Sequence, residues 1–308
     1  MGKMYKLGVY EKAMPDTLTW EERLGAAGEC GFDYAEISID ETDRRLARLD
    51  MDRAGRRELL RAMDRSGVRI ESMCLSGHRR FPLGSLDGDT RQRSLAILEK
   101  AVNLSAELGI RVIQIAGYDV YYEAGNSETR KWFGENLRLC VERAARQGVT
   151  LAFENMETPF MDTVEKAMGW VHEIDSPYLC VYPDTGNMVN GALKSGKGAA
   201  LDLEAGRGKI AAVHLKEALP GKYREVPYGT GCVPFEALIR QAWRMGVRRY
   251  LAEFWCRGGD GWMNDMRFAA GFFKKILEAA SQEGEKRPQY GRSEDRGDKH
   301  WEQRGIKY

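Results

Sequence analysis

The chain has 308 residues, with 47 Lys and Arg against 46 Asp and Glu and a formal net charge of +1. This length suits one (β/α)8 barrel of about 250 residues with a short extension. The balanced charge argues against a nucleic-acid scaffold, which normally carries a basic excess.

The sequence predicts eight short, mostly apolar β-strands, as expected of parallel strands that are buried on both faces. In chain order they lie at 6–10, 34–39, 69–75, 112–117, 150–154, 179–184, 210–215 and 250–255.

Helical patterns occupy the segments between the predicted strands, and five of them stop at a glycine, a common residue after a helix C-terminus. These five helices are expected at 20–30, 53–66, 90–108, 129–147 and 234–245. A helix, a glycine and a short strand in repeated order indicate a βα fold. Eight such units favour a closed TIM barrel over an open sheet, and no G-x-G-x-x-G fingerprint follows the first strand. We expect a single barrel domain at 1–280 and a polar, charged tail at 281–308.

Residues 1–15 lack an apolar core of signal-peptide length, and no run of 18 apolar residues exists. We therefore expect neither a signal peptide nor a membrane span. The six cysteines are scattered and form no C-x-x-C pair, which favours free thiols in a reducing compartment. A cytoplasmic protein is the expectation.

Four polar residues stand at or near the C-terminal ends of four successive predicted strands: Glu154, Asp184, His214 and Glu253. They are separated by 30, 30 and 39 residues, close to the length of a βα unit. Taken singly, each of them could be an ordinary strand-end residue that caps a helix or hydrogen-bonds a loop. Their recurrence at one place in successive units instead predicts a divalent-metal site at the mouth of the barrel. Three oxygen ligands and one nitrogen suit Mn²⁺, Mg²⁺ or Zn²⁺.

The alternation of side chains along a strand predicts which face each ligand takes. Glu154 shares a face with Ala152, and His214 shares a face with Ala212 and Lys216. An ionised Glu against the helix layer would be a costly buried charge, so Glu154, His214 and Glu253 are expected to point into the barrel.

Weaker signals follow other strands. His78 and Arg79 could meet a phosphate or sugar hydroxyls at the barrel mouth, or lie in a solvated loop. Tyr118 could contact a sugar or pack against the rim, and the segment 228–231 (YGTG) could cradle an anion or only make a turn. Lys216 is the better anion candidate because it shares the face of His214.

Several stretches resemble the L-ribulose-5-phosphate 3-epimerases, also called L-xylulose-5-phosphate 3-epimerases, of the xylose-isomerase-like TIM-barrel superfamily. They include residues 8–15 (GVYEKAMP), 72–85, 113–122, 182–187 (YPDTGN) and 212–216 (AVHLK). The resemblance covers about residues 5–280 and implies a divalent metal held by the same four residues. It also implies a small ketopentose phosphate as substrate and homo-oligomerisation. Asn187 stands where related epimerases of non-phosphorylated ketoses often carry His, which suits the phosphopentulose branch.

The expected reaction is inversion at C3 through an enediolate, with Glu154 and Glu253 as acid and base on opposite faces of the sugar. Three alternatives remain open: a free-ketose 3-epimerase, an aldose–ketose isomerase, and a non-catalytic barrel that binds a sugar phosphate. An endonuclease on the same barrel is disfavoured because a zinc cluster needs several histidines and the chain has four in total.

Overall fold

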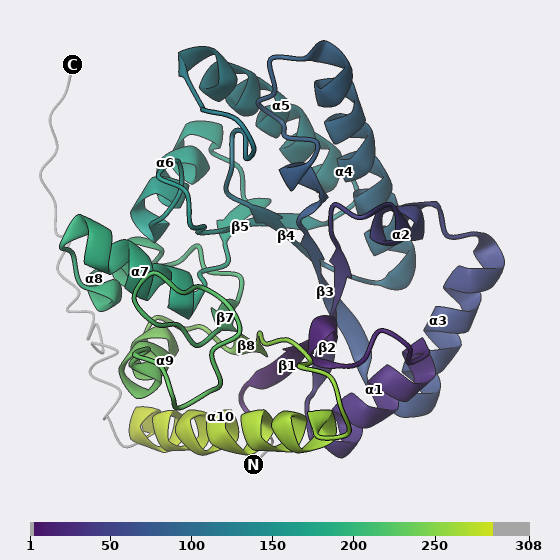
Figure 1. Ribbon diagram of the computed structural model, residues 1–308, viewed down its shortest axis with the longest axis vertical. Coiled ribbons are helices and arrows are strands. Elements are labelled where there is room, and N and C mark those ends of the chain that lie inside the picture. The colour runs from purple at the N-terminus through teal and green to yellow at the C-terminus, as the bar shows by residue number, and fades with distance from the viewer. Residues whose placement is uncertain (1–2, 286–308) are drawn as a thin grey trace, which may run out of the picture.

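A computed structural model describes residues 3–285. Its eight strands form one parallel sheet in the order β6-β5-β4-β3-β2-β1-β8-β7, which curls into a barrel (Figure 1). The strands are β1 (Lys6–Tyr10), β2 (Tyr34–Ile39), β3 (Arg69–Leu75), β4 (Val112–Ala116), β5 (Thr150–Glu154), β6 (Leu179–Val181), β7 (Val213–Leu215) and β8 (Arg249–Ala252). The predicted barrel is confirmed.

The barrel closes between β6 and β7 through isolated parallel bridges rather than a full ladder. The bridged pairs are Val181 with Ile210 and Asp184 with His214. Both strands are shorter than the predicted runs 179–184 and 210–215. Pro183 offers no N–H to a ladder, which helps to explain the early end of β6. Two of the four predicted ligands therefore take part in closing the barrel.

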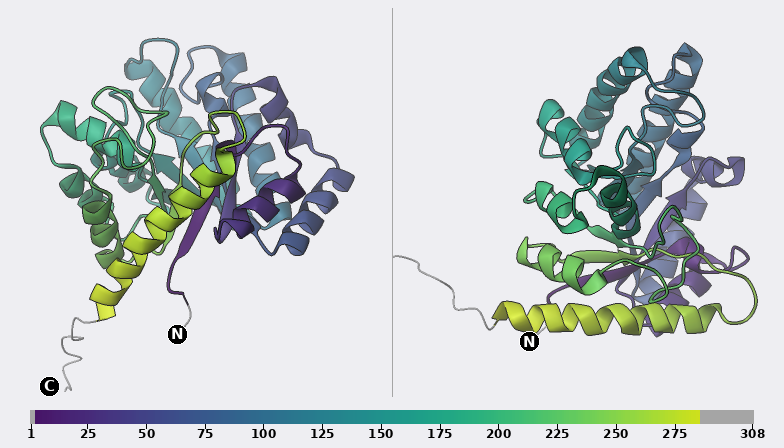
Figure 2. Two further views of the ribbon diagram at one scale, coloured as in Figure 1. Left: turned by 60° about the horizontal axis from the view of Figure 1, so that its bottom comes forward. Right: turned by 60° about the vertical axis from the view of Figure 1, so that its left-hand side comes forward.

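Helices surround the sheet in the order expected of βα units (Figures 1 and 2). The α-helices are α1 (Trp20–Glu29), α2 (Asp43–Leu46), α3 (Arg53–Ser66), α4 (Gly88–Leu108), α5 (Ser127–Arg146), α6 (Val164–Ile174), α7 (Thr185–Ser195), α8 (Ala199–Ala205), α9 (Phe235–Arg244) and α10 (Trp262–Glu285). Short 3-10 turns lie at η1 (Glu11–Ala13), η2 (Ala47–Asp50) and η3 (Gly77–Arg79).

The five predicted helices match α1, α3, α4, α5 and α9 to within a few residues. Gly67 shows why a glycine ends such a helix, because it caps α3 in the left-handed region at a φ of 70°. The last helix continues to Glu285, past the boundary predicted at residue 280. The rest of the predicted tail, 286–308, lies outside the described residues.

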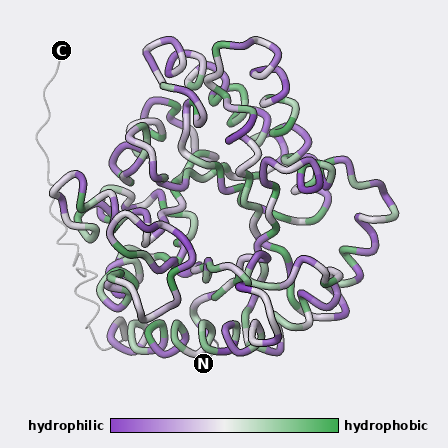
Figure 3. Tube along the Cα trace, viewed as in Figure 1, coloured by the Kyte–Doolittle hydropathy of each residue, from purple (hydrophilic) through white to green (hydrophobic). Residues whose placement is uncertain are grey.

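The apolar core has two main parts, besides a small cluster of Ala116, Tyr118 and Met156. The larger part packs the outward faces of the strands against the helices, with Ile37, Leu151 and Phe153 completely buried. The smaller part fills the barrel interior with Tyr34, Ala152, Tyr182 and Leu251 among its members. Figure 3 shows this layering, with hydrophobic strands in the centre and alternating hydropathy along outer helices such as α10.

The Tyr34 ring also explains a glycine in β1. A Cβ atom on Gly8 would lie 2.4 Å from ring carbons of Tyr34, so only glycine fits beside it. The Tyr34 side chain thus helps to fill the barrel interior beneath the mouth.

Among the described residues, no helix has the length and apolar character needed to cross a membrane.

Candidate metal centre and active site

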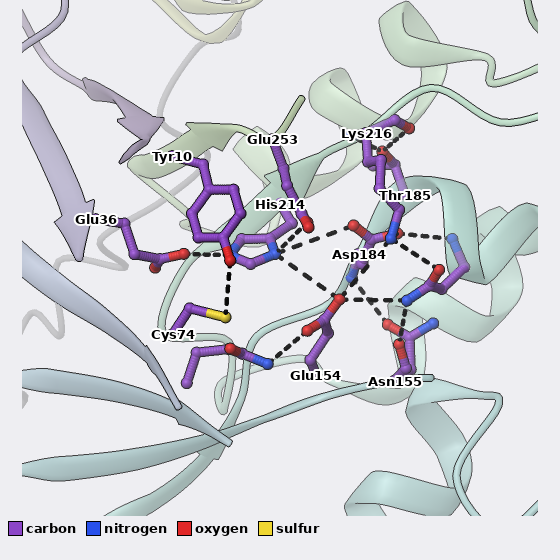
Figure 4. A network of polar contacts seen from close by, with 12 residues as sticks. Tyr10, Glu36, Cys74, Glu154, Asn155, Asp184, Thr185, His214, Lys216 and Glu253 are labelled. Atoms are coloured by element: carbon purple, nitrogen blue, oxygen red, sulfur yellow. Dashed lines mark hydrogen bonds and ion pairs between the residues drawn. The ribbon is translucent and has the colours of Figure 1, made fainter. Parts of the chain in front are cut away.

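Glu154, Asp184, His214 and Glu253 meet inside the barrel mouth (Figure 4). One ligand atom of each lies within 4.8 Å of the others, and all four side chains are buried. Glu154 is the last residue of β5, and His214 is the middle residue of β7. The structure thus brings together all four residues that the strand-end pattern singled out. Ala152 and Leu251, which share their faces with Glu154 and Glu253, line the barrel interior as the alternation predicts.

Asp184 is positioned by the start of the following helix. It is the N-cap residue of α7, and its Oδ1 accepts a hydrogen bond from the backbone N–H of Asn187 at 2.7 Å. Its own backbone N–H donates to Oδ1 of Asn155 at 2.8 Å. These bonds fix the carboxylate and leave Oδ2 directed at the cluster.

The cluster contains polar atoms that the protein itself does not satisfy. His214 Nδ1 lies 2.8 Å from Oε2 of Glu253, 3.9 Å from Oε1 of Glu154 and 4.0 Å from Oδ2 of Asp184. Asp184 Oδ2, His214 Nδ1 and Glu253 Oε2 are buried without a hydrogen bond of acceptable geometry. Buried polar atoms are normally paired. A divalent cation bound by these three atoms and Glu154 would supply the missing partner, so the residues fit such an ion.

Glu154 is held by two side-chain amides. Gln114 Nε2 donates to its Oε2 at 2.5 Å, and Asn187 Nδ2 donates to its Oε1 at 3.3 Å. Asn187 Nδ2 also donates to the backbone carbonyl of Asn155 at 2.7 Å. Neither Gln114 nor Asn155 was predicted from the sequence. Gln114 carried a usable signal, because it is the one polar residue in the β4 run VIQIA.

Lys216 belongs to the cluster through its ammonium group. Its Nζ lies 3.1 Å from Oδ1 of Asp184 and donates to Oδ1 of Asn187 at 2.9 Å. Burial disfavours the charged form, but the carboxylates of Asp184 and Glu253 outweigh it and raise the pKa of Lys216. The ammonium is therefore engaged with a carboxylate rather than held free for an anion, although Lys216 also lines the cavity above.

The two glutamates differ in electrostatic environment. Burial, followed by repulsion from Glu253, raises the pKa of Glu154 to about 8. Burial acts the same way on Glu253, but attraction from Lys216 and His214 outweighs it and lowers the pKa of Glu253. Burial also raises the pKa of Asp184, to about 6. Two carboxyl groups whose pKa values are pushed apart suit an acid and a base.

A cavity of about 190 Å³ opens above the cluster. Glu154, Lys216 and Glu253 form part of its lining, and so do Asn187 and the aromatic side chain of Trp255. Three further cations contribute to its walls: Lys12, Arg79 and Arg224. Each of these cations is paired with a carboxylate that also lines the cavity: Lys12 with Asp40 at 2.6 Å, Arg79 with Glu41 at 3.8 Å and Arg224 with Glu157 at 3.6 Å.

The loop that directly follows β3 carries two predicted site residues, His78 and Arg79, and of these two only Arg79 lines the cavity. Its Nη2 donates to the Tyr118 hydroxyl at 3.0 Å, and its guanidinium lies 4.7 Å from the centre of the Tyr121 ring. Tyr118 is buried and supports Arg79, but it does not line the cavity.

The structure does not bring His78 to the cavity. Its Nε2 lies 3.2 Å from the backbone carbonyl of Ser94 in α4, and its side chain is buried there. His78 and Arg79 are neighbours in the tight turn η3, which sends consecutive side chains in different directions. Arg79 therefore faces the cavity while His78 packs under α4.

The fold and the site agree with the relationships of the chain. Residues 24–276 match the family described as xylose isomerase-like TIM barrel, so the chain belongs to this family. More specifically, it is 46% identical over 256 residues to the L-ribulose-5-phosphate 3-epimerase UlaE of Shigella boydii serotype 18 and to that of Escherichia coli O157:H7. Each match covers 83% of this chain and 89% of the relative.

Solved structures of lower identity share the fold. A structure of L-ribulose 3-epimerase superposes with a TM-score of 0.73 at 20% identity, covering 92% of this chain and 97% of the other. A D-tagatose 3-epimerase-like protein superposes with a TM-score of 0.75 at 19% identity, covering 91% and 99%. These relatives and neighbours are named as sugar epimerases or as epimerase-like.

Proposed function

We propose that the protein is a divalent-metal-dependent 3-epimerase that interconverts L-ribulose 5-phosphate and L-xylulose 5-phosphate. The observation that carries this proposal is the convergence of Glu154 on β5 and Glu253 beyond β8 in one buried cluster with His214 and Asp184. The 46% identity to enzymes named L-ribulose-5-phosphate 3-epimerase supports the choice of substrate.

The proposed chemistry begins with the proton on C3, which is acidic because C3 is next to the C2 carbonyl. An ionised glutamate takes this proton onto its carboxylate oxygen, and the sugar is left as an enediolate. A protonated glutamate then delivers a proton to the opposite face of C3. The two carboxyls differ in surroundings, because burial raises the pKa of Glu154 whereas Lys216 and His214 lower the pKa of Glu253, so the site distinguishes the two glutamates before any ion is bound.

A divalent ion held by Glu154, Asp184, His214 and Glu253 would supply Lewis-acid stabilisation of the charge that develops at the C2 oxygen. The amides of Gln114 and Asn187 keep Glu154 in place, because both donate hydrogen bonds to its carboxylate. Arg79 and Arg224 line the cavity wall beside Glu41 and Glu157, at 3.8 Å and 3.6 Å, and their guanidinium groups could bind a phosphate in exchange for these long ion pairs. Asn187 and Lys216 also line the cavity, within reach of a bound sugar.

Two further features belong to the same proposal. The scattered cysteines, all free, suit a reducing compartment such as the cytoplasm. A homo-oligomeric state is proposed from the family resemblance alone.

The test is an isotope experiment in deuterated water. The purified protein is incubated with L-ribulose 5-phosphate and Mn²⁺, and we expect L-xylulose 5-phosphate with one deuterium at C3. A chelator should abolish the conversion and added Mn²⁺ should restore it. Free L-ribulose should turn over far more slowly. Equal turnover of the free ketose would contradict the assigned substrate, and undiminished activity of metal-free protein would contradict the metal requirement.

A further inference from the structure

Glu36 is a buried acid that the proposed chemistry does not use. It lies on β2, and its side chain has no exposed surface. Its Oε2 accepts a hydrogen bond from the Ser72 hydroxyl at 2.7 Å, and its Oε1 lies 3.1 Å from Nε2 of His214. Within residues 3–285, His214 is its sole ion-pair partner. A buried carboxylate is costly unless it is paired, so this contact calls for an explanation.

The two nitrogens of His214 face different groups. Nε2 faces Glu36, whereas Nδ1 faces Glu253, Glu154 and Asp184 (Figure 4). With a cation at Nδ1 the neutral imidazole carries its single N–H on Nε2, where the Glu36 carboxylate is the acceptor. The proton on Nε2 leaves the lone pair of Nδ1 directed into the acidic cluster. That lone pair is the ligand a cation needs.

The ring is also fixed in rotation. The Tyr182 ring packs edge-on against the His214 ring, with centroids 4.4 Å apart. Glu36 is itself anchored by Ser72 on the neighbouring strand β3. Rotation of the imidazole would break the contact with Glu36 and move Nδ1 away from the three carboxylates. Packing and hydrogen bonding therefore hold the ring in one orientation, with Nε2 at Glu36 and Nδ1 at the cluster.

We propose that Glu36 is a positioning residue of the metal centre, which acts through His214 by accepting its Nε2–H and presenting Nδ1 to the cation. The inference rests on the metal requirement in the proposed function. Glu36 does not touch the substrate cavity and takes no part in the proton transfers. Ser72 holds Glu36 in place by donating a hydrogen bond to Oε2, the carboxylate oxygen that does not face His214.

The test measures binding of Mn²⁺ alone, by competition with a chelator, in four proteins: the natural sequence, Glu36→Gln, Ser72→Ala and Glu71→Gln. Glu71 is the matched control because it lies on β3 beside Ser72 but pairs with Lys6 and Arg249 outside the cluster. We expect Glu36→Gln to bind Mn²⁺ about 10–100-fold more weakly and Ser72→Ala to show a smaller loss in the same direction. Glu71→Gln should bind as the natural sequence does.

Thermal unfolding in a chelator separates positioning from mere support of the fold. We expect metal-free Glu36→Gln to unfold at a temperature close to that of the metal-free natural sequence, while its stabilisation by added Mn²⁺ shrinks. Unchanged Mn²⁺ affinity in Glu36→Gln and Ser72→Ala would overturn the role of Glu36 and leave the proposed function standing. Failure of the natural sequence itself to bind Mn²⁺, Mg²⁺ or Zn²⁺ would overturn both.

Discussion

Burial of the His78 ring ties the stability of the protein to pH. Burial lowers the pKa of His78 from 6.5 to about 4. Above pH 6.5 the ring is neutral in both the folded and the unfolded chain, and stability is complete. As the pH falls below 6.5 the unfolded chain takes up a proton first, so stability is lost progressively until the pH passes about 4. Protonation of the unfolded chain lowers the free energy of unfolding by about 2 kcal/mol by pH 5.

The variant His78→Gln should remove this dependence. Its side-chain amide can still donate to the Ser94 carbonyl, but it does not titrate. Urea unfolding at pH 7 and pH 5 should show a loss on acidification that is smaller by about 2 kcal/mol than in the natural sequence. His172→Gln is the control, because His172 is exposed on α6. Equal losses in His78→Gln and the natural sequence would contradict this role.

Individual site residues differed in how far the sequence could predict them. Glu154 and Glu253 were predictable because a polar residue ending an apolar strand has few places to point except the barrel mouth. Glu36 and Gln114 were not, since nothing local tells whether a polar residue inside a strand bonds a ligand or a neighbour. His78 was expected at the barrel mouth or in a solvated loop, and it lies buried against α4 instead, because the direction of a side chain in a tight turn depends on backbone angles that composition does not encode.

At the scale of elements, the segment between β7 and α9 is organised around one carboxylate. Glu217 accepts hydrogen bonds from the backbone N–H groups of Gly229 at 3.0 Å and Val233 at 3.1 Å. Residues 228–231 of this segment could have cradled an anion or only made a turn, and the N–H of Gly229 is occupied by Glu217. The same segment carries Tyr223 and Arg224 into the cavity lining. Glu217 therefore couples the conformation of the segment to the substrate cavity.

Replacing Glu217 by Ala should loosen this segment. Two backbone donors lose a charged acceptor, so we expect the free energy of unfolding to fall by about 2 kcal/mol. KM for the ketopentose phosphate should rise more than kcat falls, because Arg224 is displaced while Glu154 and Glu253 are not. Steady-state kinetics and urea unfolding measure both effects. Glu236→Ala, in the exposed first turn of α9, should change neither appreciably. An unchanged KM and stability in Glu217→Ala would refute this account of the segment.

Elements with a strong local signal were predicted well. β1, β2, β3 and β5 match their predicted bounds, and α3 does so as well. β6 and β7 were predicted too long, because an apolar run does not reveal where pairing stops. Short helices such as α2 and α8 were not individually predicted, since one or two turns carry little periodicity.

At the scale of the whole molecule, closure of the barrel is what makes the site. β5 and β8 do not pair with each other, yet Glu154 and Glu253 reach the same cluster because the sheet curls round. The strand count and order could be predicted from the repeated βα pattern. The closing register could not, because it depends on the bridges from Val181 to Ile210 and from Asp184 to His214, which join residues distant in sequence.

The most direct test of the central claim is single-sided proton exchange in the variants Glu154→Gln and Glu253→Gln, each loaded with Mn²⁺. Both should lose about 10²–10⁴-fold in conversion between the two epimers, because each lacks one of the opposed acid–base groups. In deuterated water, each variant should still exchange the C3 proton of one epimer, namely the one whose C3–H faces the remaining glutamate, and the two variants should exchange opposite epimers. Near-normal conversion in either variant, or exchange of the same epimer by both, would contradict the claim that the two glutamates work on opposite faces of C3.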